Sequence, residues 1–135
     1  MDKLEDAELS ALCDVNPQKF EEVTAAAEDF DHEVEGAGSL PEGVSTFSNY
    51  EDMLDSGEVD LVIVSVPHYF HPQISIAAFE RGINVISEKP VGITAREARQ
   101  MNQDYQDSEV VFSAMFQKRT QGVTNKFKQM IEEDD

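Results

Sequence analysis

The 135-residue sequence predicts an α/β protein built on a doubly wound parallel sheet. Two observations lead to this fold class. Short apolar runs alternate regularly with segments that have apolar residues at helical spacing. The strongest run, 60–67, is apolar on both faces, as is typical of a central strand in a parallel sheet. Ligands of such sheets bind beyond the carboxyl ends of the strands, so the residues that follow each strand are the candidates for function.

Strands and helices alternate along the whole chain. The predicted strands are 8–13, 44–47, 60–67, 83–87 and 110–115. The predicted helices are 17–30, 49–54, 72–81, 95–105 and 123–133. The acidic, glycine-containing residues 31–43 are predicted to form a loop.

Capping signals set the helix boundaries. Asn16 is the expected N-cap of the first helix, with Pro17 at its first helical position. Residues 48–51 and 94–97 both match the capping box, in which a hydroxyl and a Glu three residues later satisfy free backbone N–H groups. Gly82 is the expected end of the third helix.

Composition excludes several classes of function. The net charge of −18, from 28 acidic and 10 basic residues, would repel a phosphate backbone, so no nucleic-acid partner is expected. This acidity fits a solvated surface or a host with high internal salt, and composition does not separate the two. The longest apolar run, 61–66, is too short to cross a bilayer, and residues 1–8 lack the apolar core of a signal peptide. With one cysteine, Cys13, we expect a cytoplasmic protein.

Asp14 directly follows a predicted strand and precedes a helix. In a dinucleotide-binding fold, a carboxylate at this position accepts hydrogen bonds from the adenosine ribose hydroxyls. No arginine occurs in residues 15–17 to neutralise a 2′-phosphate, which favours NAD over NADP. The competing interpretation is that Asp14 only helps to cap the following helix or turn.

Two further strand ends carry polar side chains. Lys89, after the fourth strand, could stabilise negative charge or orient a substrate hydroxyl, or could be a surface lysine in an ion pair. His71 could line a cofactor pocket, or could cap a helix. His68 and His71 have no third ligand nearby in the sequence, so no metal site is predicted.

The glycine-rich loop that should precede Asp14 is missing from this chain. Such a loop is expected about 20 residues before the acid. Only thirteen residues precede Asp14 and none is glycine, while Gly36-Ala37-Gly38 follows no strand. The first strand is missing with the loop, so strands 8–13 and 60–66 lose their central neighbour. Either a cleft remains, or these two strands pair directly, or another chain donates a strand.

In combination, these segments resemble the family of glucose–fructose oxidoreductase, inositol dehydrogenase and rhizopine-catabolism proteins (Gfo/Idh/MocA). The matching stretches are 11–17, 50–54, 59–67, 71–72 and 82–90. The resemblance extends over about residues 7–131, and Glu88-Lys89-Pro90 is its most diagnostic part.

The resemblance implies a Rossmann-like sheet, here without its first strand and glycine-rich loop. It also implies transfer of hydride between a sugar, polyol or related alcohol and a nicotinamide cofactor. Lys89 matches the family's catalytic lysine. The residues that the resemblance places in the cofactor site are Asp14, Pro67, His71, Glu88, Lys89 and Pro90. Residues 116–119 resemble the segment that leads toward the substrate domain.

We therefore predict a partial dinucleotide-binding domain in residues 1–119 and the start of a connection to a missing substrate domain in 120–135. By itself, such a fragment is expected to be inactive, and whether it forms a homo-oligomer stays open. One alternative is a non-catalytic remnant that binds a partner through an exposed sheet edge. A receiver-type signalling domain fits less well, because Asp14 has no acidic neighbour and no aspartate follows Val66.

Overall fold

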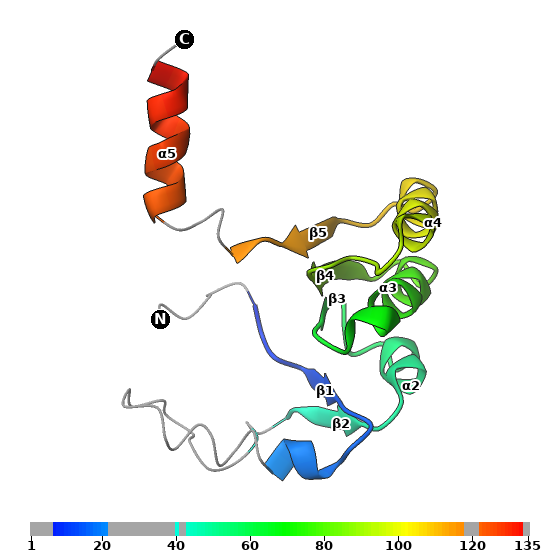
Figure 1. Ribbon diagram of the computed structural model, residues 1–135. Coiled ribbons are helices and arrows are strands. Elements are labelled where there is room, and N and C mark those ends of the chain that lie inside the picture. Colours follow the sequence, from blue (N-terminus) through cyan, green and yellow to red (C-terminus); the bar gives the residue numbers. More distant parts are fainter. Residues whose placement is uncertain (1–6, 22–39, 41–42, 118–121, 134–135) are drawn as a thin grey trace. The chain divides into compact units, whose positions relative to one another are not determined.

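The structure, a computed structural model, describes residues 7–21, 40, 43–117 and 122–133. The chain divides into two compact units, Met1–Asp60 and Leu61–Asp135. Both contain parallel strands connected through helices (Figure 1). This confirms the predicted fold class.

The first unit contains a two-stranded parallel sheet. Strand β1 (Ala11–Cys13) pairs with β2 (Ser45–Phe47), with Leu12 opposite Thr46. Helix α2 (Tyr50–Asp55) contacts both strands and buries Leu54.

The helix that follows β1 begins where the sequence predicts. The Asn16 side chain accepts a hydrogen bond from the backbone N–H of Gln18 at 3.1 Å, and residues 18–21 are helical. The apolar face predicted further along, with Val23, Ala27 and Phe30, lies outside the described residues, as does most of the predicted loop.

The cap of α2 differs from the prediction. Asn49, not Ser48, is the N-cap: its backbone is extended and its side chain accepts the N–H of Glu51 at 2.8 Å. An asparagine oxygen reaches the N–H two residues ahead, so the helix begins one residue later than a Ser48 cap would allow.

The second unit is a three-stranded parallel sheet with helices packed on it. Its strands pair in the order β3–β4–β5. Their bounds are Leu61–Val64, Asn84–Glu88 and Phe112–Met115. The helices are α3 (His71–Phe79), preceded by the short 3-10 turn η1 (His68–Phe70), then α4 (Ala95–Gln106) and α5 (Gly122–Glu133). Gly82 ends the turn after α3 with a φ of +71°, a conformation that glycine adopts without steric cost.

The core of this unit lies between the sheet and the two helices α3 and α4 (Figure 1). Its buried apolar side chains are Val62, Val64, Ala78, Phe79, Ile83, Val85 and Met101. Three aromatic rings join helices to sheet: Phe79, Tyr105 and Phe112 have centroids 5.6 to 5.8 Å apart in tilted and edge-on arrangements. Such geometries are the favourable ones for aromatic pairs.

Only one face of β3 is covered within its own unit. Val62 and Val64 are buried, whereas Leu61 and Ile63 are 44% and 64% exposed. Alternate side chains of a strand point to opposite faces, and α3 packs on one of them. The sequence predicts a strand that is apolar on both faces. Within this unit, the side chains on one of these faces, Leu61 and Ile63, are exposed.

The described strand ladders bear on the predicted gap in the sheet. In them β1 pairs only with β2, and β3 only with β4. Direct pairing of β1 with β3 is therefore not among the described ladders, and the other two outcomes stay predictions. None of the described helices combines the length and apolar character that a membrane span requires.

Met101→Ala tests the helix–sheet core. Met101 on α4 is 2% exposed, so removing its side chain should leave a cavity and lower the free energy of unfolding by about 2–5 kcal/mol. Met130→Ala on α5 is the matched control, because Met130 is 54% exposed and should change stability by no more than about 0.5 kcal/mol. Urea unfolding followed by circular dichroism measures both, and equal effects would contradict the packing described here.

Candidate functional site

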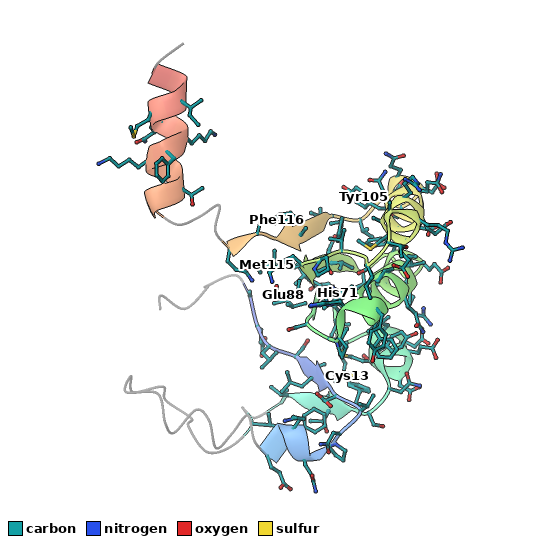
Figure 2. All side chains as sticks on the ribbon, viewed as in Figure 1. Cys13, His71, Glu88, Tyr105, Met115 and Phe116 are labelled. Atoms are coloured by element: carbon teal, nitrogen blue, oxygen red, sulfur yellow. The ribbon has the colours of Figure 1, made fainter. Side chains whose placement is uncertain are left out.

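The parallel register brings three strand ends of the second unit to one edge of its sheet. Val64 of β3 lies opposite Ser87 of β4, and Glu88 lies opposite Met115 of β5. The segments that leave this edge are 65–70, 88–90 and 116–117. Figure 2 shows His71, Glu88 and Met115 gathered at this end of the sheet. Five of the six predicted cofactor-site residues therefore lie on or beside these segments: Pro67, His71, Glu88, Lys89 and Pro90.

His71 connects two of these segments. Its side chain is completely buried at the start of α3. Ring atom Nε2 lies 2.8 Å from the carbonyl oxygen of Val66, and Nδ1 lies 2.8 Å from the carbonyl oxygen of Pro90. A carbonyl oxygen only accepts hydrogen bonds and a neutral imidazole carries a single N–H, so the tautomer decides which of the two contacts is an N–H···O bond. The imidazole thus ties the end of β3 to the turn after β4.

Glu88 is held from the neighbouring strand. The side-chain amide of Gln117, two residues after β5, donates to both Glu88 carboxylate oxygens, at 2.9 and 3.1 Å. Gln117 belongs to the segment 116–119, which the sequence places directly beyond a strand, but no site role is predicted for this residue. The neighbouring Lys118 and Arg119 of the predicted connecting segment lie outside the described residues.

The chain beyond Pro90 is fixed by the first turn of α4. The carboxylate of Glu97 accepts the N–H groups of Ile93 and Thr94 at 3.0 and 2.8 Å, and the Thr94 hydroxyl accepts the N–H of Glu97 at 3.2 Å. This confirms the predicted capping box at 94–97. These bonds, first of all the one from the Thr94 backbone, lower the pKa of the Glu97 carboxyl. Gly92 passes so close that an added Cβ would lie 3.1 Å from the Ala98 nitrogen.

Lys89 is exposed between these fixed points. Its own backbone N–H lies 3.3 Å from a Glu88 carboxylate oxygen, and its peptide bond to Pro90 is cis. An exposed ammonium on a turn attached at both sides can donate hydrogen bonds or move a proton at a defined place. In the turn after β3, the tilted rings of Tyr69 and Phe70, with centroids 4.4 Å apart, are 59% and 40% exposed.

Asp14 occupies the carboxyl end of β1 in the first unit. Its backbone N–H donates to the carbonyl of Phe47 at 3.1 Å, which continues the ladder, and its Oδ1 accepts the N–H of Asn16 at 2.8 Å. The capping role considered as an alternative is therefore present. Within the part of the chain that the structure describes, Oδ2 has no hydrogen-bond partner, so this oxygen can still accept from a ligand.

The neighbouring cysteine does not fit a nucleophilic role. Burial raises the pKa of the Cys13 thiol, and the negative charges of Asp14 and Asp52 raise it further. At neutral pH the thiol is therefore protonated, and the protonated form is the unreactive one.

Each unit, taken by itself, offers chemistry of the kind that a nicotinamide dinucleotide requires. In the first unit the Asp14 carboxylate can accept from hydroxyl groups, and in the second the exposed Lys89 can donate to a developing negative charge. The turn 14–17 between β1 and the following helix contains no glycine, so it does not provide a phosphate cradle.

Comparison with known proteins is consistent with this arrangement. Residues 1–116 match the sequence model of the Gfo/Idh/MocA oxidoreductases, described as an oxidoreductase family with an NAD-binding Rossmann fold. The levoglucosan dehydrogenase of Pseudarthrobacter phenanthrenivorans is 30% identical over 86 residues, and the rhizopine catabolism protein MocA of Rhizobium meliloti is 39% identical over 57. These alignments cover 64% and 42% of the chain.

A solved structure extends the likeness to three dimensions. The WlbA dehydrogenase of Bordetella pertussis, in complex with NADH and UDP-GlcNAcA, superimposes with a TM-score of 0.76 at 27% identity. That superposition covers 94% of this chain and 35% of the dehydrogenase. The chain spans about a fifth of the two curated relatives, 22% and 18% of their lengths.

Glu97→Gln tests the anchor beyond Pro90 through its pH dependence. A glutamine keeps the cap but cannot ionise. Because the folded pKa of Glu97 is lowered, its extra stabilisation is present above the unfolded pKa and is lost as pH falls through the folded value. Wild type should therefore be more stable than the variant at neutral pH, and the difference should vanish at an acidic pH below the folded pKa of Glu97.

Urea unfolding at both pH values measures this difference. The same pair compared in a Thr94→Ala background is the control, since the contribution of the Thr94 hydroxyl to the lowered pKa is then lost while the backbone bond stays, and the difference should shrink in part at neutral pH. A difference that does not change with pH would contradict the assignment.

Proposed function

Because the chain belongs to the Gfo/Idh/MocA family of oxidoreductases, we propose that it forms the cofactor-binding part of an NAD-dependent dehydrogenase. The substrate class we propose is a sugar, a polyol or a related alcohol. The observation that carries the proposal is the exposed Lys89 at the carboxyl edge of the sheet, on a turn whose two sides are anchored by Gln117 and His71. The names of the relatives, a levoglucosan dehydrogenase among them, support the substrate class.

Asp14 is the residue we assign to the cofactor's ribose. Its Oδ2 is available, and no basic side chain occurs in residues 15–17 to pair with a 2′-phosphate. A second negative charge beside this carboxylate would be repelled, so NAD is preferred over NADP. In this proposal, Pro67, Glu88 and Pro90 form the backbone frame of the cofactor edge.

Lys89 is the residue we assign to the chemistry. Bound NAD would accept hydride from the carbon of the substrate alcohol. The Lys89 ammonium, placed near the reacting hydroxyl, would orient that oxygen and stabilise the negative charge that develops on it as its proton passes to water. A lysine suits this task because its three donors are carried on a flexible stem that can follow the oxygen.

The whole enzyme requires parts beyond these assignments. We propose that residues 1–119 contribute to the cofactor domain and that 120–135 begin the connection to a substrate domain. The fold of the second unit supports a role for the edge at 65–70 and 88–90 in facing the cofactor.

Lys89→Ala tests the catalytic assignment in a full-length enzyme that carries this chain. Turnover should fall by about a hundredfold or more, the usual scale for a positioned acid–base group. Lys126→Ala on α5 is the matched control, because it removes another exposed lysine and should leave turnover within twofold, about the effect of a neutral surface change. Steady-state kinetics measures both, and undiminished turnover in Lys89→Ala would remove this residue from the mechanism.

Asp14→Ala tests the cofactor assignment in the same enzyme. Losing a charged hydrogen-bond acceptor should raise the Michaelis constant for NAD roughly tenfold or more and reduce the preference over NADP. Asp107→Ala, at the end of α4, removes an exposed carboxylate elsewhere and serves as the control. An unchanged ratio of kcat/KM for the two cofactors would show that Asp14 only caps its turn.

A further inference from the structure

We propose that His71 is a positioning residue: through Nδ1 and the carbonyl oxygen of Pro90, it holds the turn that carries Lys89 at the carboxyl edge of the sheet. The functional meaning of this role rests on the proposed function of Lys89. The sequence-based expectation is that His71 lines the cofactor pocket. The structure assigns its ring nitrogens to the protein's own backbone instead.

The surroundings of the ring leave it little freedom to serve a ligand. The side chain has no exposed surface, and both nitrogens lie 2.8 Å from carbonyl oxygens. A ligand could take one of these nitrogens only by displacing the Val66 or Pro90 carbonyl and by reaching a ring that has no exposed surface. The ring of His68, the exposed neighbour in the turn, lies edge-on to the His71 ring, with centroids 5.5 Å apart.

The ring is itself firmly placed. His71 is the first residue of α3, where the following Pro72 is also buried and suits the first turn of a helix. Its Nε2 atom lies 2.8 Å from the carbonyl oxygen of Val66, just beyond the end of β3. Because α3 packs on both β3 and β4, the imidazole is a fixed point against which the Pro90 carbonyl is held.

The turn that carries Lys89, residues 88–90, is therefore held by one side chain on each side. Gln117 fixes the Glu88 carboxylate before it, and His71 fixes the Pro90 carbonyl after it. A lysine on a flexible stem can be aimed only as well as its backbone is held. Loss of the His71 anchor should free the backbone of Lys89 while the capping box at 94–97 stays intact.

The test compares two substitutions that each keep one end of the imidazole. Asparagine places an amide donor near the position of Nδ1, and glutamine places one near the position of Nε2. In the 135-residue chain, His71→Asn should retain the rigid turn and His71→Gln should lose it. The measurement is ¹⁵N relaxation of the Lys89 and Val91 amides, with order parameters near about 0.85 when rigid and below about 0.6 when released.

Controls separate this role from a general loss of packing. His68→Asn makes the same chemical change on the exposed neighbour and should leave both amides rigid. If His71 had only a packing role, the two substitutions at this position would change the unfolding midpoint and the mobility of the turn by similar amounts. Equal order parameters in His71→Asn and His71→Gln, or a rigid turn in His71→Gln, would overturn the proposal.

A measurement on the unsubstituted chain keeps the proposal testable if a variant does not fold. The proposal requires a proton on Nδ1, because the Pro90 oxygen only accepts. The imidazole ¹⁵N chemical shifts of His71 should show a protonated Nδ1, and an unprotonated Nδ1 would overturn it. These experiments need no cofactor. If His71 does not hold the turn, the proposed function of Lys89 is unaffected. If a Lys89→Ala enzyme keeps full turnover, that function is refuted, and the role of His71 in holding the turn is unaffected.

Discussion

The parallel pairing of β3, β4 and β5 is the constraint on which the candidate site depends. In a parallel ladder all strands run in one direction, so each strand delivers its next residues to the same edge. The register, with Val64 opposite Ser87 and Glu88 opposite Met115, decides which residues become neighbours there. A shift by one residue would exchange the two faces of a strand, turning buried Val85 outward. Burial of the apolar side chains thus also fixes the place of Lys89.

Side chains from outside the strand ladder hold the segments that follow the strands. A turn beyond a strand has lost its regular backbone partners, and its polar groups must find others. Here His71 from α3, Gln117 beyond β5 and Glu97 from α4 supply them. The residue that we assign to chemistry makes none of these anchoring side-chain contacts. This separation leaves Lys89 exposed for a ligand while its backbone is held by others, the arrangement that a preorganised site requires.

Charge has different roles at the two strand ends. At β1, burial and then the charges of Asp14 and Asp52 raise the pKa of the Cys13 thiol, and Asp14 can accept hydroxyl donors. At β4, the carboxylate of Glu88 is engaged by the neutral amide of Gln117. An amide donor satisfies the carboxylate without adding a second positive charge next to Lys89. In a chain with a net charge of −18, an exposed lysine at a ligand edge is a distinctive feature.

The sequence alone determined the fold class, the order of the elements and most of their boundaries. Hydrophobic period, capping residues and Gly82 are local signals, and each reports on a few neighbouring residues. The capping box at 94–97 and the strand that leads to Glu88 could be predicted from such local signals. The cap of α2 was mispredicted because Ser48 and Asn49 both match local cap chemistry, and the geometry of the turn selects between them.

Only the tertiary structure decided what the strand-end residues contact. The partners of His71 are 5 and 19 residues away, and Gln117 is 29 residues from Glu88. No local pattern encodes such distances, because they arise when separate strands align in one ladder. The sequence could therefore identify His71 and Glu88 as candidates by their positions after strands. That the imidazole serves the backbone, and that Gln117 belongs to the same edge, follows from the pairing of β3, β4 and β5.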